Sequence, residues 1–296
     1  IIDLAGGHQP MWDSRSGIGI VYNGEVYNYK AIREALEKSG IRFQTTSDSE
    51  VVLKTLTLKG PRAVHDWNGM FAVAAWNGRE KKLLLIRDRM GVKPLYYYWD
   101  GSHLLFASEI KALLASNLCP RRLNRQAIWD YLTYRYVPGP ETIWQNVWKL
   151  PPGHMLEWSP NEEPRLSRYW RSDVISVDEP IDIDQKTKEF EDLFLDSVAK
   201  RLLARGHKVR GTTRKADSAT AKALAEKGVE IVTANLEDRA SVDRAVQGVD
   251  ERVAFAAELL DLIRLFCERF HDSNARDILL DHGRHFAVQI VHLAPL

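Results

Sequence analysis

The sequence predicts an α+β fold over its first two thirds, followed by a smaller α/β fragment and a helical tail. Short apolar runs separated by Asn-Gly and Asp-Gly pairs are typical of a hairpin-rich antiparallel sheet. From residue 186 to residue 250, helix and strand patterns alternate, which is typical of a parallel β-α-β unit. The composition also changes between these parts, because all nine Trp and all ten Tyr lie at or before Trp170. We therefore expect two or three pieces with different origins.

The elements of the first part follow from these patterns in chain order. A strand over 17–22 leads into Asn23-Gly24, a pair that by itself favours a hairpin turn. An amphipathic helix over 29–39 ends at Gly40. Further strands are expected at 71–76, 82–87 and 104–107, and further helices at 109–115 and 125–132.

The later part is expected to alternate helices with strands. Helix patterns lie at 186–204, 218–227 and 241–247, and strand patterns at 208–213 and 229–234. Segment 171–185 is acidic and lacks apolar periodicity, so we expect a linker there. The tail, 251–296, opens with apolar residues at helical spacing from Phe255 to Phe266, and its last run, 286–293, fits a strand or a short helix.

Charge and composition exclude several classes of function. The formal net charge of +1 predicts no basic surface for nucleic acid and no attraction to an anionic membrane. The longest unbroken apolar run, 70–76, is far shorter than the roughly 20 residues that cross a bilayer. Two cysteines, Cys119 and Cys267, cannot form a disulfide framework, which favours a reducing, cytoplasmic location.

Two short segments contain candidate site residues. A buried strand that ends in Asn23-Gly24 brings a side-chain amide and a backbone N–H together, and two such donors can hold an oxyanion. An ordinary hairpin turn is the simpler interpretation of the same pair. Asp48, which precedes a helix pattern, either binds the ammonium group of a ligand or belongs to a helix cap.

Six segments in a fixed order give these candidates a context. They are 1–11, 22–28, 47–50, 67–72, 87–97 and 106–111. Together they resemble the glutaminase domain of glutamine-hydrolysing asparagine synthetases, which are class II amidotransferases of the N-terminal-nucleophile hydrolase fold. Segments 136–143, 149–154 and 168–170 extend the resemblance toward the synthetase half, to about residue 203. The resemblance implies an αββα sandwich of two antiparallel sheets for residues 1–170.

The resemblance also implies a role for each candidate. In the family, the thiolate of an N-terminal Cys attacks the side-chain amide of glutamine, with its own α-amine as base. Asn23 and the N–H of Gly24 match the oxyanion hole, and Glu25 and Asp48 match the groups that hold the α-amino end of glutamine. The released ammonia reaches aspartate that ATP and magnesium have activated. Glutamine is thus the expected ligand. Whether the chain forms a homodimer is left open by the resemblance.

The sequence departs from the family pattern in two places. Residue 1 is Ile and the first cysteine is Cys119, remote from every site segment, so we expect an N-terminally truncated domain and an inert Cys119. The Ser-Gly-Gly-x-Asp-Ser pyrophosphate loop that should follow Leu203 does not occur in the sequence. We therefore expect no glutaminase activity from this polypeptide and no cofactor on the residues present.

Segments 202–215, 227–238 and 240–250 carry a second resemblance. Residues 197–250 resemble an NmrA-like, atypical short-chain dehydrogenase. This implies that Arg214 and Lys215 follow the second strand, where basic groups meet the 2′-phosphate of NADP. The first strand and its glycine-rich turn are absent, so we expect packing rather than NADP binding.

Two other interpretations stay open besides the amidotransferase: an NADP-binding sensor and a non-catalytic interaction protein.

The tail contains His282 and His285, but these lack a ligand pair at a zinc spacing. We therefore expect no metal site there.

Overall fold

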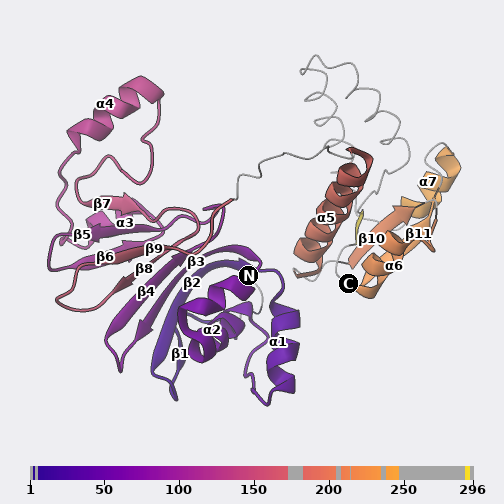
Figure 1. Ribbon diagram of the computed structural model, residues 1–296, viewed down its shortest axis with the longest axis horizontal. Coiled ribbons are helices and arrows are strands. Elements are labelled where there is room, and N and C mark those ends of the chain that lie inside the picture. Colours follow the sequence, from indigo (N-terminus) through magenta and orange to yellow (C-terminus); the bar gives the residue numbers. More distant parts are fainter. Residues whose placement is uncertain are drawn as a thin grey trace. The chain divides into compact units, whose positions relative to one another are not determined.

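The computed structural model describes residue 3 and residues 6–172, 183–204, 208–213, 215–234, 238–246 and 291–293. The chain divides into two compact units, Ile1–Ser176 and Val177–Leu296 (Figure 1). Each unit has its own buried core, so the two are treated separately below.

The larger sheet of the first unit has six strands in the order β1-β2-β3-β4-β8-β9, and every neighbouring pair is antiparallel. The expected strands at 71–76 and 82–87 are confirmed. The strands are β1 Met11–Asp13, β2 Ile18–Val26, β3 Gly69–Asn77, β4 Lys82–Arg87, β8 His154–Trp158 and β9 Arg165–Arg168.

The predicted turn at Asn23-Gly24 is wrong. Strand β2 continues through both residues to Val26, with Asn23 opposite Ala72 and Gly24 opposite Phe71 of β3. A Cβ atom on Gly24 would lie 2.6 Å from the Phe71 Cα and closer still to the Met70 carbonyl oxygen. A glycine therefore serves here for close approach of two backbones, because no side chain fits between the paired strands.

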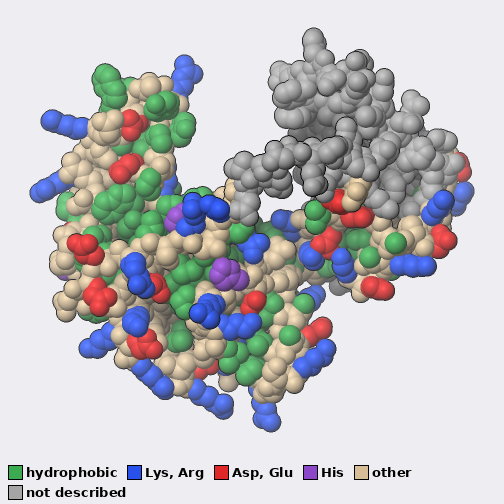
Figure 2. All heavy atoms as spheres, viewed as in Figure 1, with side chains coloured by type: hydrophobic (Ala, Val, Ile, Leu, Met, Phe, Trp, Pro, Cys, Tyr) green, Lys and Arg blue, Asp and Glu red, His purple; other side chains and the backbone are tan. Residues whose placement is uncertain are grey.

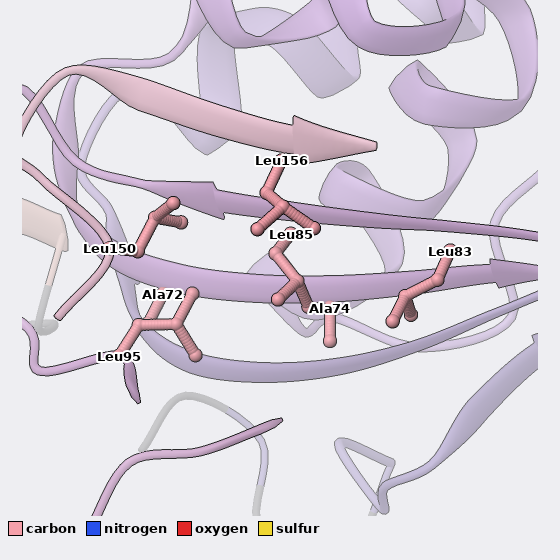
Figure 3. Packing of buried hydrophobic residues seen from close by; sticks show 7 residues of the cluster. All are labelled: Ala72, Ala74, Leu83, Leu85, Leu95, Leu150 and Leu156. Atoms are coloured by element: carbon pink, nitrogen blue, oxygen red, sulfur yellow. The ribbon is translucent and has the colours of Figure 1, made fainter. Parts of the chain in front are cut away.

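A smaller antiparallel sheet packs face to face on the larger one. Its order is β6-β5-β7, with β5 Tyr96–Trp99, β6 Leu104–Ala107 and β7 Val147–Lys149. The core between the sheets consists of Ala72, Ala74, Leu83, Leu85, Leu95, Leu150 and Leu156, and side chains of β5 and β6 pack against it. Figure 3 shows the side chains of Ala74, Leu85 and Leu156 gathered from three neighbouring strands.

Helices lie outside the two sheets. Helix α1 is Tyr29–Lys38, α2 is Asp48–Lys59, and the 3₁₀ helix η1 is Gly60–Asp66. Because successive residues of a strand point to opposite faces, Tyr22 points away from the core that contains Ala72 and Ala74, and its hydroxyl reaches Asp48 of α2. Helix α3, Ile110–Ala115, covers the smaller sheet through the buried Leu113, which packs with Tyr98 and Val147. The expected helices at 29–39 and 109–115 are confirmed.

Helix α4, Arg125–Tyr134, confirms the helix expected at 125–132. It buries Ala127 but leaves Trp129 and Leu132 about seven-tenths exposed, at 69% and 71%. Figure 2 shows hydrophobic side chains gathered over this helix.

The second unit contains α5 Ile183–Ala204, β10 Lys208–Thr213, α6 Ala219–Glu226, β11 Val229–Thr233, α7 Arg239–Val246 and β12 Val291–Leu293. Strands β10 and β11 are parallel, which confirms the predicted β-α-β unit. Leu195, Val209 and Leu224 form the centre of its core.

One predicted boundary of this unit is wrong, because helix α5 begins at Ile183, inside the segment expected to be a linker. The run 286–293 was expected to be a strand or a short helix, and residues 291–293 form a strand that pairs antiparallel with β10. The apolar stripe from Phe255 to Phe266 lies outside the described residues.

Candidate functional site

Strand β2 and the start of α2 bring the predicted site residues of the first unit together. Asn23, Gly24 and Glu25 follow one another in β2, and Asp48 is the first residue of α2. The Tyr22 hydroxyl donates to the Asp48 Oδ2 at 2.7 Å, and the Val26 N–H donates to the same oxygen at 3.2 Å. The Asp48 carboxylate therefore lies against the strand that carries the other three residues.

The helix start settles which residue caps α2. Ser47, not Asp48, is the N-cap, and its hydroxyl oxygen accepts from the Ser49 N–H at 3.2 Å. Asp48 is thus not needed for capping, and its carboxylate points to β2 instead. The first turn of a helix also favours a negative charge.

A second buried carboxyl group, that of Glu25, acts on Asp48 at this place. Asp48 is 4% exposed and Glu25 is 8% exposed. Burial raises the pKa of Asp48, and the negative charge of Glu25 raises it further, while the bonds from Tyr22 and Val26 act in the opposite direction. Burial and the nearby Asp48 also raise the pKa of Tyr22, so its phenol stays protonated and donates. Such a pair of carboxyl groups favours a cationic partner.

Replacing Asp48 by Asn should raise the melting temperature at neutral pH. The folded wild type holds a proton on Asp48 above the ordinary value of 3.8. Its stability therefore falls as pH rises from that value through the raised pKa, and stays lower above it. Asn keeps an acceptor for Tyr22 without this loss. Thermal unfolding should show the gap between variant and wild type closing toward acid pH. A gap that is equal at every pH would contradict the argument.

Asn23 lies on the opposite face of β2 from Tyr22. Its side chain is exposed, and its Nδ2 donates to the Ser108 Oγ at 3.3 Å. Ser108 follows β6 and precedes α3, so this bond joins the larger sheet to the end of a strand in the smaller sheet. Neither Ser108 nor Tyr22 was singled out from the sequence, because each acts through a contact that joins distant segments.

The segment 87–97 joins β4 to β5, and its side chains bind the backbone around it. The Arg87 guanidinium donates to the carbonyl oxygens of Gly91, Lys93 and Leu150 at 2.6 to 2.8 Å. The Asp88 carboxylate accepts from four backbone N–H groups of the same region.

The predicted residues of the second unit do not form a described site. Arg214 lies outside the described residues, and Lys215 is exposed after β10. Strand β12 runs antiparallel to β10 on the edge opposite β11. In a dinucleotide-binding sheet, a parallel strand with a glycine-rich turn holds that place.

The described residues also contain no group of three His, Cys, Asp or Glu side chains arranged for a metal ion. His282, His285 and Cys267 lie outside them. Of the helices that the structure describes, none is both long and apolar enough to span a membrane.

Comparison with known families decides how residues 1–170 should be classified. The glutamine amidotransferase domain family matches the whole of this range, which contains Asn23, Gly24, Glu25 and Asp48. The chain belongs to this family. Its amidotransferase domain is of class II and asparagine synthetase-like, and the NmrA-like family matches residues 196–263.

Curated relatives of the amidotransferase domain are considerably longer than this chain. Asparagine synthetase 1 of Bacillus subtilis is 34% identical over 198 residues, which are 67% of this chain and 31% of the relative. Asparagine synthetase 2 of the same species is 35% identical over 208 residues, 67% of this chain and 28% of the relative. An amidase of Gibberella zeae is 34% identical over 208 residues, 69% of this chain and 29% of the relative. The chain therefore spans a little under a third of the length of these relatives.

A solved structure is similar to part of the chain. It is the glutamine phosphoribosylpyrophosphate amidotransferase of B. subtilis in complex with ADP and GMP. The similarity has a TM-score of 0.41 at 18% sequence identity and covers 76% of this chain and 48% of that one.

Proposed function

We propose that residues 1–170 are the glutamine-binding domain of a glutamine-dependent asparagine synthetase, with the αββα sandwich of the N-terminal-nucleophile hydrolases. The observation that carries the proposal is the position of Asp48 against β2, the strand that contains Asn23, Gly24 and Glu25. The relatives named above add support, because the B. subtilis proteins are glutamine-hydrolysing asparagine synthetases.

The proposed contacts divide glutamine by charge. Its α-ammonium group lies beside Asp48 and Glu25, whose buried negative charges it balances. Its side-chain carbonyl lies at Asn23 and Gly24. An amide N–H of Asn23 donates to the carbonyl oxygen, and this bond strengthens as negative charge develops during attack by a thiolate.

Hydrolysis needs a thiol close to Asn23, and the described cysteine is elsewhere. Cys119 is buried with Tyr98, Leu113 and Val147 under α3, and burial raises the pKa of its thiol. We therefore propose that this polypeptide binds glutamine without hydrolysing it. Activation of aspartate by ATP and magnesium is proposed only for a synthetase part like that of the longer relatives. For NADP, no contact among the described residues of the second unit supports binding.

Titration with glutamine, followed by NMR of the full chain, tests the proposal. We expect saturable shifts of the backbone signals of β2 and the start of α2, with glutamine recovered unchanged. Asp48→Asn should weaken binding at least tenfold, because a charged hydrogen bond to the ammonium group is lost, about 1.5–3 kcal/mol. The matched control, Asp66→Asn, removes an exposed carboxylate and should bind like the wild type. Equal affinity in both variants would reject the proposed site.

A further inference from the structure

We propose that Ser108 is a positioning residue, which holds the side-chain amide of Asn23 so that one of its two N–H groups points at the substrate. The inference rests on the proposed function and adds a residue to the same site. It starts from the hydrogen bond that Asn23 Nδ2 donates to the Ser108 Oγ at 3.3 Å, between residues 85 positions apart.

The position of Asn23 explains why its amide needs an anchor. The side chain leaves β2 on the face opposite Tyr22 and is exposed, so solvent alone would leave its rotamers free. The backbone below it is fixed, because Asn23 pairs with Ala72 of β3. Only the side-chain torsions remain to be set, and a hydrogen bond from the far end of the amide sets them.

Ser108 comes from a part of the fold that is itself held in place. The preceding residue, Ala107, pairs with Tyr96 in the smaller sheet, and α3 begins two residues after Ser108 at Ile110. The hydroxyl is thus presented from a strand end, and the Asn23 amide is fixed from both sheets. Sites built on such rigid elements keep their geometry better than sites on loops.

The chemistry of the amide gives this contact its effect. An Asn side chain has two N–H donors on one nitrogen, in a fixed plane. When one N–H is donated to Ser108, the direction of the other is determined. A donor that is already oriented stabilises a developing oxyanion without a reorganisation cost at the moment of reaction. In this role Ser108 acts through Asn23 rather than on the ligand.

The test compares two ligands that differ only at the end that Asn23 contacts. Glutamine and norvaline share the α-amino acid group, but norvaline has no side-chain amide. In Ser108→Ala we expect glutamine to bind about 3- to 10-fold more weakly, the range of one hydrogen bond, while norvaline binds as in the wild type. Ser108→Thr, which keeps the hydroxyl, should restore glutamine binding. Ser39→Ala, which removes an exposed hydroxyl bonded within α1, is the control.

A second measurement keeps the outcome independent of ligand binding. In the wild type, one side-chain amide proton of Asn23 should exchange with solvent more slowly than the other, and this difference should disappear in Ser108→Ala. The role of Ser108 is overturned if Ser108→Ala loses affinity equally for glutamine and norvaline. It is also overturned if the exchange rates of the Asn23 side-chain amide protons do not change in this variant. If the wild type binds neither ligand, the proposed function is wrong, and the exchange rates alone then decide the inference.

Discussion

Asp88→Ala should lower the free energy of unfolding by about 3–5 kcal/mol, enough to unfold much of the first unit at 37 °C. The Asp88 side chain is 1% exposed. Its Oδ1 accepts from the N–H groups of Met90 and Val92 at 3.1 and 2.9 Å. Its Oδ2 accepts from those of Lys93 and Phe71 at 2.9 and 3.3 Å. In Asp88→Ala, these four backbone N–H groups lose the carboxylate oxygens that accept their hydrogen bonds.

Urea unfolding, followed by tryptophan fluorescence, measures this effect. Asp88→Asn keeps one oxygen acceptor of similar shape and should lose about half as much stability. Asp66→Ala removes an exposed carboxylate that pairs with Lys59 and should change stability by less than about 1 kcal/mol. If Asp88→Ala were as mild as Asp66→Ala, the carboxylate would not organise the turn that follows β4.

Gly24→Ala should cost about 3 kcal/mol, the upper range for an overpacked interior. The added methyl carbon would meet backbone rather than a flexible side chain, since the Phe71 Cα lies 2.6 Å away and the Met70 carbonyl oxygen is closer still. Strands β2 and β3 would have to separate at the point where Asn23 pairs with Ala72. We expect glutamine binding to disappear together with the stability.

Gly40→Ala separates steric clash from the general strain of replacing a glycine. Gly40 has a positive φ of 85°, but a Cβ atom there meets nothing within 4 Å. Its substitution should cost only about 1–2 kcal/mol, from the backbone conformation alone. Denaturant midpoints of the two variants, measured side by side, give the comparison. A larger loss at Gly40 than at Gly24 would contradict the close approach of β2 and β3.

Much of the fold follows from local pattern. The apolar runs at 82–87 and 104–107 coincide with β4 and β6, and the helix expected at 29–39 ends at Lys38, shortly before Gly40 with its positive φ. Local pattern does not predict strands β8 and β9, since β9 is a four-residue edge strand with every side chain exposed. Such a strand exists because β8 pairs with it, and a single sequence carries no mark of that pairing.

The candidate site was also predictable only in part, because the sequence shows motifs and local preferences but not the contacts between distant segments. The order of the motifs led to Asn23, Gly24, Glu25 and Asp48, but the local preference of Asn-Gly for a turn gave the wrong backbone. Pairing over nine residues of β3 outweighs that preference. The contacts from Tyr22 to Asp48 and from Asn23 to Ser108 span 26 and 85 positions, so only the folded chain reveals them.

Strand β12 has one further consequence, for the behaviour of the second unit in solution. Its three residues pair with Lys208, Val209 and Arg210 along the side of β10 that β11 does not cover. Without them, a row of unpaired N–H and C=O groups would face outward, and such a row is a template for strands of neighbouring molecules. The short strand β12 therefore occupies backbone groups of Lys208, Val209 and Arg210 that would otherwise be open to a strand of a neighbouring molecule.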